Sequence, residues 1–506
     1  MARRRNILFI TADQWRGDCL SALGHRCVRT PTLDALAGEG VLFAQHFANT
    51  SPCSPSRATL HTGLYLHNHR VTVNGTPLDA RHTNWALEMR KAGLEPALVG
   101  YTDQTPDPRG LDPLDPRLRT YEGLLPGLSP FAQMGMENPG DWATALKSRG
   151  YQLPDDLRLL VWMREGGPDY EDGNPHPKPF AIAAEDNDTA WCVDRAIDFI
   201  SERKGEDFVL HLSLLRPHPP FIASEPWNRF IDPAHVPAPV RRASLDEEGD
   251  QHPFLAWLLS NPIQRASSNE RKLRRQKAIY FSLMAEVDHH LGRLFAFLRQ
   301  QGLFEDTLIV FTSDHGEMMG DHWLLGKSGY FDQAYHVPLI IKSPEPASCR
   351  GARVTVFSEH VDVMPTLLAH LGLTVPAACD GRALQPLIET GAAPAHWRDA
   401  AHFEFDWRDV TDDSAEHMLG LSFEACNLSV RRSATHKLVH FAGLRPLLFD
   451  LTRDPVEMED LSRHPDSQAL LLRETQALLS WRMRTDDRTL THMKATDEGI
   501  RARTED

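Results

Sequence analysis

Short apolar segments that alternate with helical segments constrain the fold of this chain more than any other feature. Runs rich in branched residues, each bounded by turn residues, predict buried strands over 6–12, 96–101, 208–215, 307–313 and 337–342. Between these runs, the spacing of apolar residues predicts helices over 32–39, 55–64, 84–92, 188–204 and 269–301. This alternation is typical of an α/β fold in which helices cover a large parallel or mixed sheet.

The pattern changes after about residue 380, where short strands over 428–431, 437–441 and 447–451 precede a helix over 467–484. With 506 residues, the chain is longer than a single hydrophobic core usually serves. We therefore predict a catalytic α/β domain over 1–380 and a smaller α+β lobe over 381–506 whose tail mediates oligomerisation. The Pro-rich and Gly-rich stretch 104–180 predicts long loops with short helices.

Charge and cysteine content narrow the class of protein. The formal net charge is −15 and no long basic run occurs, which argues against a nucleic-acid or membrane partner. The seven cysteines are an odd number without a C-x-x-C pair, which indicates free thiols in a reducing compartment. The apolar run after Arg5 spans only about five residues, too short for a signal peptide, and no run reaches the ~20 residues of a membrane span. We therefore expect a cytoplasmic protein.

The helix expected over 269–301 has two different faces. Ile279, Leu283 and Val287, followed by further leucines, recur at three- and four-residue steps and form an apolar stripe. The polar residues between them are expected to form a solvated face; these are Glu286, Asp288, His289 and His290.

Polar side chains follow four of the expected strands. In open α/β sheets, ligands bind at the carboxyl ends of the strands, so these side chains are expected to gather on one rim. They are Asp13 and Gln14, Tyr101 and Asp103, His218, and Asp314 and His315. Carboxylate oxygens, the Gln14 carbonyl and an imidazole are ligands of divalent cations. By itself, however, an Asp at a strand end is more often a cap or turn residue.

Other polar residues have simpler explanations when considered alone. Asn74-Gly75 is first a turn signal, and the prolines beside His218 are explained by a rigid loop. Lys327 lies in a Gly-Lys-Ser-Gly loop that lacks the upstream glycine and strand of a P-loop. Three neighbouring histidines fit a polar surface at least as well as a metal cluster; these are His61, His67 and His69.

A motif that begins at Cys53 favours a functional interpretation of the residues at the strand ends. The run Cys53-Ser54-Pro55-Ser56-Arg57, with Leu60, Thr62 and Gly63, resembles the sulfatase signature C-x-P-S-R-x-x-L-x-T-G. The runs D-Q-W-R from Asp13 and T-S-D-H-G-E from Thr312 occur in the same order as in sulfatases. Nearly the whole chain thus resembles the sulfatases of the alkaline phosphatase superfamily, and within them the cytosolic arylsulfatase and phosphonate monoester hydrolase branch. The resemblance implies an alkaline phosphatase-like fold.

Departures from the sulfatase pattern bear on the substrate. Most sulfatases have a second Asp in place of Gln14, an Asn in place of His315 and a Lys-x-His pair where Tyr101 and Asp103 fall. These differences resemble the phosphonate monoester hydrolases. Ser54 and Ser56 instead follow the sulfatase consensus, since the phosphonate hydrolases carry Gly and Ala there.

The resemblance also implies a set of site residues. In that family the cysteine is oxidised to formylglycine, so Cys53 would become the nucleophile and, with Asp13, Gln14, Asp314 and His315, bind one Mn²⁺ or Ca²⁺ ion. Arg57 would hold the second oxygen of the nucleophile or the anionic substrate, and His218 and Lys327 would assist the leaving oxygen. The implied substrate-binding residues are Asn74, Tyr101 and Asp103.

The implied activity is hydrolysis of sulfate monoesters, with promiscuity toward related esters. One alternative makes phosphonate monoesters or phosphodiesters the main substrates. Another is a catalytically silent anion-binding protein in which Cys53 stays a thiol, and a Ser nucleophile at 54 or 56 would require a second metal cluster. The expected partners are a small-molecule ester, a formylglycine-generating enzyme that acts transiently, and further copies of the chain in a tetramer or dimer.

Overall fold

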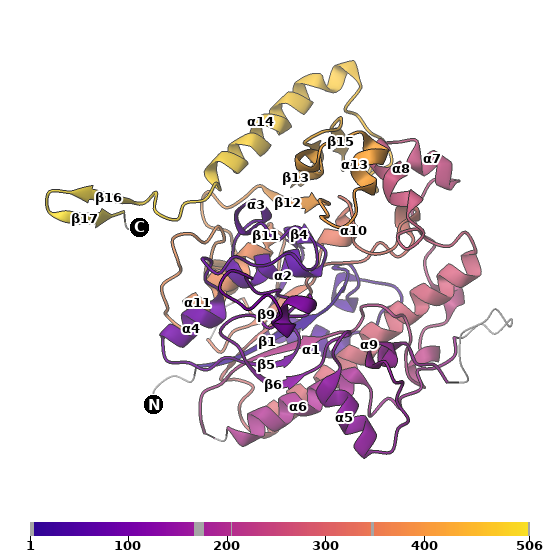
Figure 1. The fold of residues 1–506 in the computed structure, drawn as a ribbon, viewed down its shortest axis with the longest axis vertical. Helices are drawn as coiled ribbons and strands as arrows, with labels where there is room; N and C mark the ends of the chain where they lie inside the picture. The colour runs from indigo at the N-terminus through magenta and orange to yellow at the C-terminus, as the bar shows by residue number, and fades with distance from the viewer. Residues whose placement is uncertain (1–4, 166–176, 204, 346–348, 504–506) are drawn as a thin grey trace.

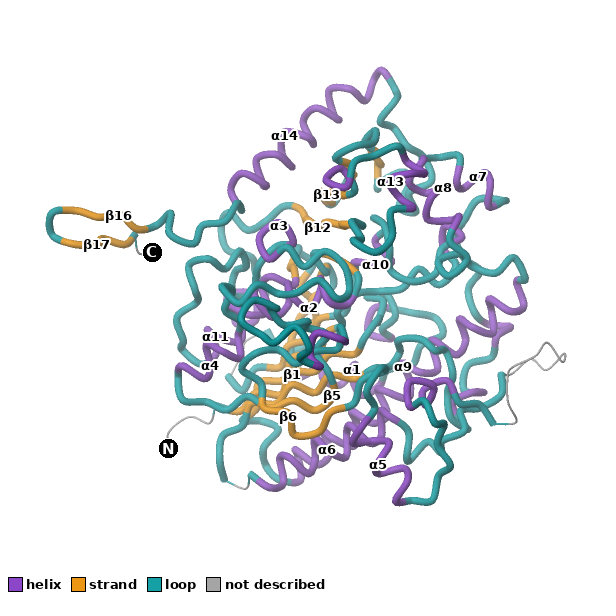
Figure 2. The backbone as a smooth tube through the Cα atoms, viewed as in Figure 1, coloured by secondary structure: helices purple, strands orange, loops and turns teal. Residues whose placement is uncertain are grey.

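The computed structural model describes residues 5–165, 177–203, 205–345 and 349–503. Its centre is an eight-stranded mixed sheet with the strand order β10-β2-β9-β8-β1-β7-β5-β6 (Figures 1 and 2). These strands are β1 (Asn6–Ala12), β2 (Val41–Phe43), β5 (Ala97–Gly100), β6 (Ser129–Gln133), β7 (Val209–Leu214), β8 (Thr307–Thr312), β9 (Leu339–Lys342) and β10 (Ala352–Val354). The predicted α/β class with a large mixed sheet is confirmed.

Four adjacent strands at the centre of this sheet run parallel. Ile10 of β1 lies opposite Leu212 of β7 on one side and Phe311 of β8 on the other, and β5 pairs with β7 in the same direction. The carboxyl ends of β5, β7, β1 and β8 therefore meet at one edge. β9 runs antiparallel to β8 and β2, which makes the sheet mixed.

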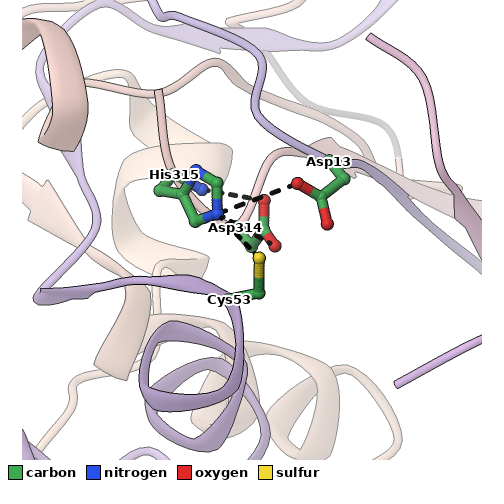
Figure 3. Close-up of side chains that lie close together, drawn as sticks. All are labelled: Asp13, Cys53, Asp314 and His315. Carbon is green, nitrogen blue, oxygen red and sulfur yellow. Dashed lines mark hydrogen bonds and ion pairs between the residues drawn. The ribbon is translucent and has the colours of Figure 1, made fainter. Parts of the chain in front are cut away.

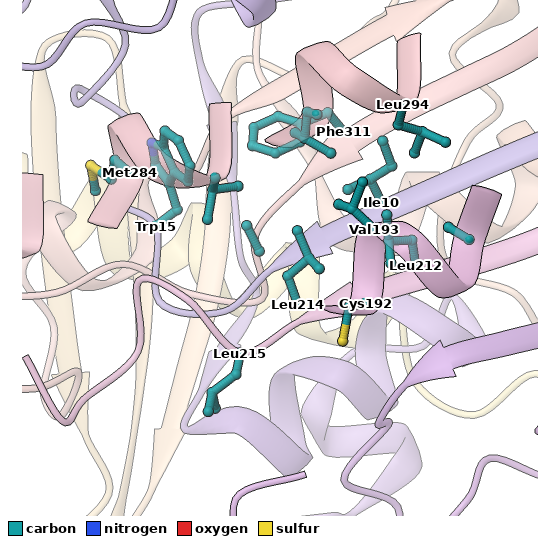
Figure 4. Packing of buried hydrophobic residues seen from close by; sticks show 14 of the residues in the cluster. Ile10, Trp15, Cys192, Val193, Leu212, Leu214, Leu215, Met284, Leu294 and Phe311 are labelled. Atoms are coloured by element: carbon teal, nitrogen blue, oxygen red, sulfur yellow. The ribbon is translucent and has the colours of Figure 1, made fainter. Parts of the chain in front are cut away.

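Alternating side chains of β1 enter two separate cores. Leu8 and Ile10 pack toward α1 (Pro31–Glu39), α6 (Asp188–Glu202) and α9 (Glu270–Gln300), while Ile7 and Phe9 face the other side. Figure 4 shows part of the first core, where residues of α6 and α9 meet the sheet. The second core is covered by α2 (Cys53–Thr62), α4 (Trp85–Lys91) and α11 (Val363–His370).

The polar residues of α9 do not form the solvated face expected from the sequence. Glu286 and Asp288 are each 1% exposed and His290 is also buried, while His289 is exposed. The carboxylate of Asp288 accepts the backbone N–H groups of Thr32 and Leu33 in the first turn of α1. That expectation was wrong for the three buried residues because α9 packs against α1 and α6. The starts of these helices supply hydrogen-bond partners for Asp288 and Glu286, whereas His290 contacts Arg293 of α9 itself.

A five-stranded sheet forms the core of the smaller C-terminal lobe. Its order is β15-β14-β13-β12-β4, with β12 (Ala400–Asp406), β13 (Asn427–Ser433), β14 (His436–Phe441) and β15 (Leu447–Asp450). The fifth strand, β4 (Thr50–Ser51), comes from the N-terminal part of the chain and pairs with β12 directly before Cys53. α14 (Gln468–Arg484) packs against β13 and β14. The division of the chain into domains near residue 380 stays a prediction.

The remaining elements are short. β3 (His46–Phe47) pairs with β11 (Ser358–Glu359), and β16 (Met493–Thr496) pairs with β17 (Gly499–Ala502) in a hairpin that projects from the body (Figures 1 and 2). The other α-helices are α3 (Leu66–His69), α5 (Gly140–Ser148), α7 (Leu245–Gly249), α8 (Pro253–Ser260), α10 (Asp332–Tyr335), α12 (Gln385–Thr390) and α13 (Ser414–Leu419). The stretch 104–180, expected as loops with short helices, contains α5 and the edge strand β6, and its residues 166–176 lie outside the described residues.

Two expectations from composition can be compared with this structure. All seven cysteines lie in the described ranges and all are free thiols, as predicted. Within those ranges, no helix combines the length and the apolar character that a membrane crossing requires.

Candidate active site

Four buried side chains converge at the carboxyl edge of the parallel strands. Asp13 follows β1, Asp314 and His315 follow β8, and Cys53 opens α2 beneath them. Figure 3 shows the four side chains directed toward one another, and their potential ligand atoms all lie within 4.8 Å of each other. The sequence analysis expected these four residues to be metal ligands, and the structure brings them together.

This group suits a divalent cation. His315 Nε2 lies 3.2 Å from Cys53 Sγ, 3.6 Å from Asp314 Oδ2 and 3.7 Å from Asp13 Oδ1. Asp13 Oδ1 is buried and has no hydrogen-bond partner among the described residues. An unpaired buried carboxylate oxygen is costly, and a cation bound by two carboxylates and an imidazole would offset that cost. The donor set therefore fits the expected divalent metal ion.

Gln14 is held beside this group in an unusual backbone conformation. Its φ of 67° lies in the left-handed region, which residues other than glycine rarely adopt. Two hydrogen bonds hold it there: its N–H donates to Asp314 Oδ1 at 3.0 Å, and its carbonyl accepts from the Tyr280 hydroxyl at 2.7 Å. The side-chain oxygen of Gln14 accepts from Lys327 Nζ at 2.8 Å, while its amide nitrogen donates to Glu317.

Arg57 binds both carboxylates from below. Located one helical turn after Cys53, it donates from Nη2 to Asp13 Oδ2 at 2.9 Å and from Nε to Asp314 Oδ2 at 3.0 Å. Its Nη1 donates to Ser213 Oγ at 2.9 Å. The guanidinium is 1% exposed, so in this structure it orients the two carboxylates. Its expected contact with the nucleophile or substrate stays a prediction.

Burial and neighbouring charges set the protonation states of the group. Burial, with the nearby charge of Asp314, raises the pKa of Asp13. Burial alone would also raise the pKa of Asp314, but His315, Arg57 and Lys327 hold it below its ordinary value. Asp314 is therefore the more acidic carboxyl of the pair.

Lys327 and His218 line the cavity beside the four potential metal ligands. Lys327 Nζ lies 3.1 Å from Cys53 Sγ, and although burial opposes its charge, Cys53, Asp13 and Asp314 raise its pKa to about 12. His218 is half-buried, and its Nδ1 donates to the carbonyl of Pro219 at 2.6 Å, which leaves Nε2 as the free nitrogen. Both residues line a cavity of about 520 Å³ together with Gln14 and Glu317.

The three expected substrate-binding residues lie near the potential metal ligands or the residues next to them. The Tyr101 hydroxyl donates to Asp13 Oδ2, and the Tyr101 ring lies 4.3 Å from the guanidinium of Arg57. Asp103 Oδ2 lies 3.7 Å from Arg57 Nε, and burial raises the pKa of Asp103 well above its ordinary value. Asn74 is exposed and accepts the backbone N–H of Ser54 at 3.0 Å. Their contact with substrate stays a prediction.

Several supporting residues were not identified from the sequence. Glu317 accepts hydrogen bonds from Gln14 and from the backbone of Met319 and Gly326, and Ser213 binds Arg57. Glu317 ends the T-S-D-H-G-E run and could have been inferred from it. Ser213 lies inside β7, where no sequence signal distinguishes it from a structural residue.

The three histidines near α2 do not form a metal cluster. His61, His67 and His69 are buried, contrary to the polar surface considered for them, and each has a different partner. Trp85 Nε1 donates to His61, Glu404 lies 2.8 Å from His67, and Thr59 lies 2.9 Å from His69. Within the described ranges, the group at Asp13 is the one set of His, Cys, Asp and Glu side chains with metal-binding spacing.

Comparison with known proteins assigns the fold and the family. The sulfatase family model matches residues 5–373, and the model of the N-sulphoglucosamine sulphohydrolase C-terminal region matches residues 320–484. The chain belongs to the sulfatase family. The sulfatase family is a family of hydrolases within the alkaline phosphatase superfamily. The predicted family and the predicted alkaline phosphatase-like fold are therefore confirmed.

Near-full-length relatives refine this placement. The chain is 40% identical to the multifunctional alkaline phosphatase superfamily protein PehA of Trinickia caryophylli, covering 99% of both chains. It is 29% identical to an arylsulfatase of Clostridium perfringens, covering 90% of each. The crystal structure of a phosphonate monoester hydrolase of Agrobacterium radiobacter matches with a TM-score of 0.94 and 45% identity, over 99% of this chain and 100% of that one.

Proposed function

We propose that this protein hydrolyses phosphonate monoesters and phosphodiesters as its main substrates, and sulfate monoesters as secondary ones. The observation that carries the proposal is the similarity, over 99% of the chain, to a multifunctional superfamily member and to a phosphonate monoester hydrolase. Gln14 and His315, which depart from the usual sulfatase pattern, support the same order of preference. The expectation of sulfate monoesters as main substrates is thus reversed in favour of its alternative.

The charge of the substrates explains why one site can serve all three classes. Sulfate monoesters, phosphonate monoesters and phosphodiesters are tetrahedral and carry a single negative charge near neutral pH. The phosphorus esters concentrate this charge on fewer terminal oxygens. A site with the buried Arg57 and the half-buried Lys327 beside a cation-binding group is suited to such compact anions.

A formylglycine at residue 53 would supply an aldehyde hydrate as nucleophile, and a divalent cation would lower the pKa of its hydroxyl and neutralise substrate oxygens. The residues that would hold this cation are Asp13, Gln14, Asp314, His315 and residue 53 itself. Arg57 fixes the orientation of the two carboxylates through its hydrogen bonds to Asp13 and Asp314.

Lys327 and His218 would act on the leaving oxygen. Lys327 keeps its positive charge beside residue 53, so it can stabilise negative charge that develops on the departing alcohol. His218 lines the same cavity, and with Nδ1 bonded to Pro219 its other ring nitrogen would exchange a proton with the leaving oxygen. We also infer that a formylglycine-generating enzyme modifies residue 53 and that the mature protein needs no other macromolecule for catalysis.

Two substrates with one leaving group test the proposal. We expect kcat/KM for 4-nitrophenyl phenylphosphonate to exceed kcat/KM for 4-nitrophenyl sulfate by at least about tenfold. A higher value for the sulfate ester would reverse the assignment. Cys53→Ala should abolish both reactions if they share one site, whereas Cys192→Ala, which alters a buried thiol of α6, should leave both intact.

A further inference from the structure

A second cavity borders a different face of α9 from the catalytic cavity. It has a volume of about 360 Å³ and is enclosed by the loop after β1, residues 23–26, residues 237–240 and α9. On α9 it is lined by Lys277, Tyr280 and Phe281, whereas the catalytic cavity is lined by Lys272, Arg275, Gln276 and Ile279. Helical periodicity places these two sets on separate faces of the helix.

Lys277 is the feature of this cavity that requires an explanation. Its side chain is buried, with 5% of the residue exposed, yet it lines the cavity. Among the described residues, Lys277 forms no hydrogen bond or ion pair. Burial lowers the pKa of Lys277, although the more distant charges of Asp321 and Asp18 oppose the shift. Most of the side chain is thus packed in the protein while the residue opens on the cavity, where an anionic occupant would form an ion pair with the ammonium.

The nearby carboxylates are already engaged elsewhere. Arg16 binds Asp18 at 2.7 Å and Asp321 at 2.8 Å, and Asp321 also accepts the backbone N–H of Val240. With Arg26 exposed at the rim, the cavity is lined by three cations, Arg16, Arg26 and Lys277, against these two carboxylates. The balance favours a ligand with one negative charge.

His25 supplies a second donor on the same cavity. Its Nδ1 accepts the backbone N–H groups of Cys27 at 3.2 Å and Val28 at 2.9 Å, so the neutral ring carries its hydrogen on Nε2. The ring packs edge-to-face on Phe281, with centroids 4.8 Å apart. Phe281, together with Leu23 and Met319, adds an apolar wall.

We propose that this cavity is an accessory binding site for a small carboxylic acid anion with an apolar body. The carboxylate pairs with Lys277 and accepts from His25, and the apolar body packs on Phe281 and Met319. One ammonium and one neutral donor match the single charge of a carboxylate. The volume lies within the ~300–1,000 Å³ range of small-molecule sites.

The site adjoins the catalytic centre through one tyrosine. The Tyr280 hydroxyl accepts the backbone N–H of Arg16 at 3.0 Å and donates to the carbonyl of Gln14 at 2.7 Å. An occupant beside Arg16 therefore lies next to the loop that fixes Gln14. This accessory site is separate from the proposed hydrolytic function and does not depend on it.

A bromide soak of crystals of the unaltered protein tests the anion site directly. We expect an anomalous peak in contact with Lys277 Nζ. Calorimetric titration with benzoate then tests the ligand class. Lys277→Met should weaken benzoate binding by at least about tenfold, because it removes the ion pair and keeps the side-chain volume. Lys277→Arg should retain binding, and Lys147→Met, which alters an exposed lysine of α5, should bind as the unaltered protein does.

Either of two results would overturn the proposal. One is a bromide map without a peak at Lys277, which would mean that only water occupies the cavity. The other is equal benzoate affinity of the unaltered protein and Lys277→Met, since any benzoate bound would then lie elsewhere. Thermal unfolding of each variant confirms that it is folded, and the bromide soak needs no variant. Because both readouts measure binding, they are independent of whether the protein hydrolyses phosphonate esters.

Discussion

Cys53 occupies a position that disfavours ordinary thiol chemistry. The residue is buried, and burial together with the charge of Asp13 raises the pKa of its thiol well above the ordinary value. Since the thiolate and not the thiol is the nucleophile, an unmodified Cys53 would react poorly near neutral pH. Replacement of the sulfur by an aldehyde hydrate removes this difficulty, which agrees with the formylglycine implied by the motif.

Lys327 gives the first prediction at this scale. Lys327→Met should lower kcat/KM by roughly 10²–10³ for an alkyl ester, because a poor leaving group depends most on the ammonium. The loss should be smaller for the 4-nitrophenyl ester, whose leaving oxygen needs little help. Steady-state kinetics with both esters measures the difference.

A matched lysine makes that result specific. Lys272 is exposed on α9 and lines the outer part of the same cavity, so Lys272→Met should change kcat/KM by less than about threefold. Equal losses for the alkyl and nitrophenyl esters in Lys327→Met would show that Lys327 does not act on the leaving oxygen.

The sequence predicted the potential metal ligands at the centre of the site better than the residues that form hydrogen bonds to the surrounding side chains. Asp13, Asp314 and His315 follow strands whose ends must meet, so their convergence with Cys53 could be inferred from the sequence. The hydrogen-bond partners of Arg57 could not be inferred in this way. Ser213, for example, is 156 residues away from Arg57 in the chain, and a hydrogen bond between such distant side chains leaves no local pattern in the sequence.

At the scale of elements, α9 links the two helices beside it through buried carboxylates. Asn187, the N-cap of α6, donates to Glu286 at 2.6 Å, while Asp288 binds the start of α1. Burial, with the nearby charge of Asp188, raises the pKa of Glu286 to about 8 even though Arg216 opposes the shift. Glu286 is therefore largely protonated at neutral pH.

This raised pKa predicts a pH-dependent stability. Above the ordinary pKa of 4.5 and below about 8, the folded protein holds a proton that the unfolded chain has lost. The free energy of unfolding should therefore fall as pH rises, by up to about 1.4 kcal/mol per unit. Guanidinium unfolding at pH 6 and pH 8 should show a loss about 2 kcal/mol larger in the unaltered protein than in Glu286→Gln.

The glutamine variant keeps an acceptor for Asn187 and removes only the titration. Glu202→Gln, at the exposed end of α6, serves as the control and should behave as the unaltered protein does. Identical pH dependence in Glu286→Gln and the unaltered protein would show that Glu286 is already ionised at pH 6.

Elements with strong apolar runs were predictable, and short ones were not. β1, β7 and β8 match the expected strands closely because each is buried throughout. β2 and β10 have three residues each, too few to give a pattern, and β6 is an edge strand that contains Pro130. α2 begins two residues earlier than expected, which places Cys53 in its first turn.

At the scale of the whole molecule, the C-terminal lobe holds the segment that precedes Cys53 in place. β12 pairs with β4, and β4 ends two residues before Cys53. The sequence revealed the lobe through its strand pattern, but a two-residue strand shared between distant segments gave no signal. The lobe thus acts as part of the site's scaffold.

The C-terminal end gives a prediction about assembly. β16 and β17 are exposed along their whole length, and the apolar residues Met493 and Ile500 on them are 45% and 68% exposed. Apolar side chains on a projecting hairpin suit an intersubunit contact. Deletion of 491–506 should therefore convert a dimer or tetramer to a smaller species in light scattering. It spares the buried Trp481 and also Arg488, which donates to the carbonyl of Cys379.

Thermal unfolding is the companion measurement for this deletion. The truncated chain should keep its own fold, because every residue of the two hairpin strands is exposed in the single chain. An unchanged mass in solution would exclude the hairpin as the oligomer contact.

The central claim is that residue 53 and its three neighbours form a metal-centred catalytic site. A crystal structure of protein produced together with a formylglycine-generating enzyme tests it most directly. The account predicts density for a hydrated aldehyde at residue 53 and an ion about 2.0–2.6 Å from the oxygens of Asp13 and Asp314 and from His315 Nε2. An unmodified thiol at residue 53, with no ion bound after soaking in Mn²⁺ or Ca²⁺, would contradict it.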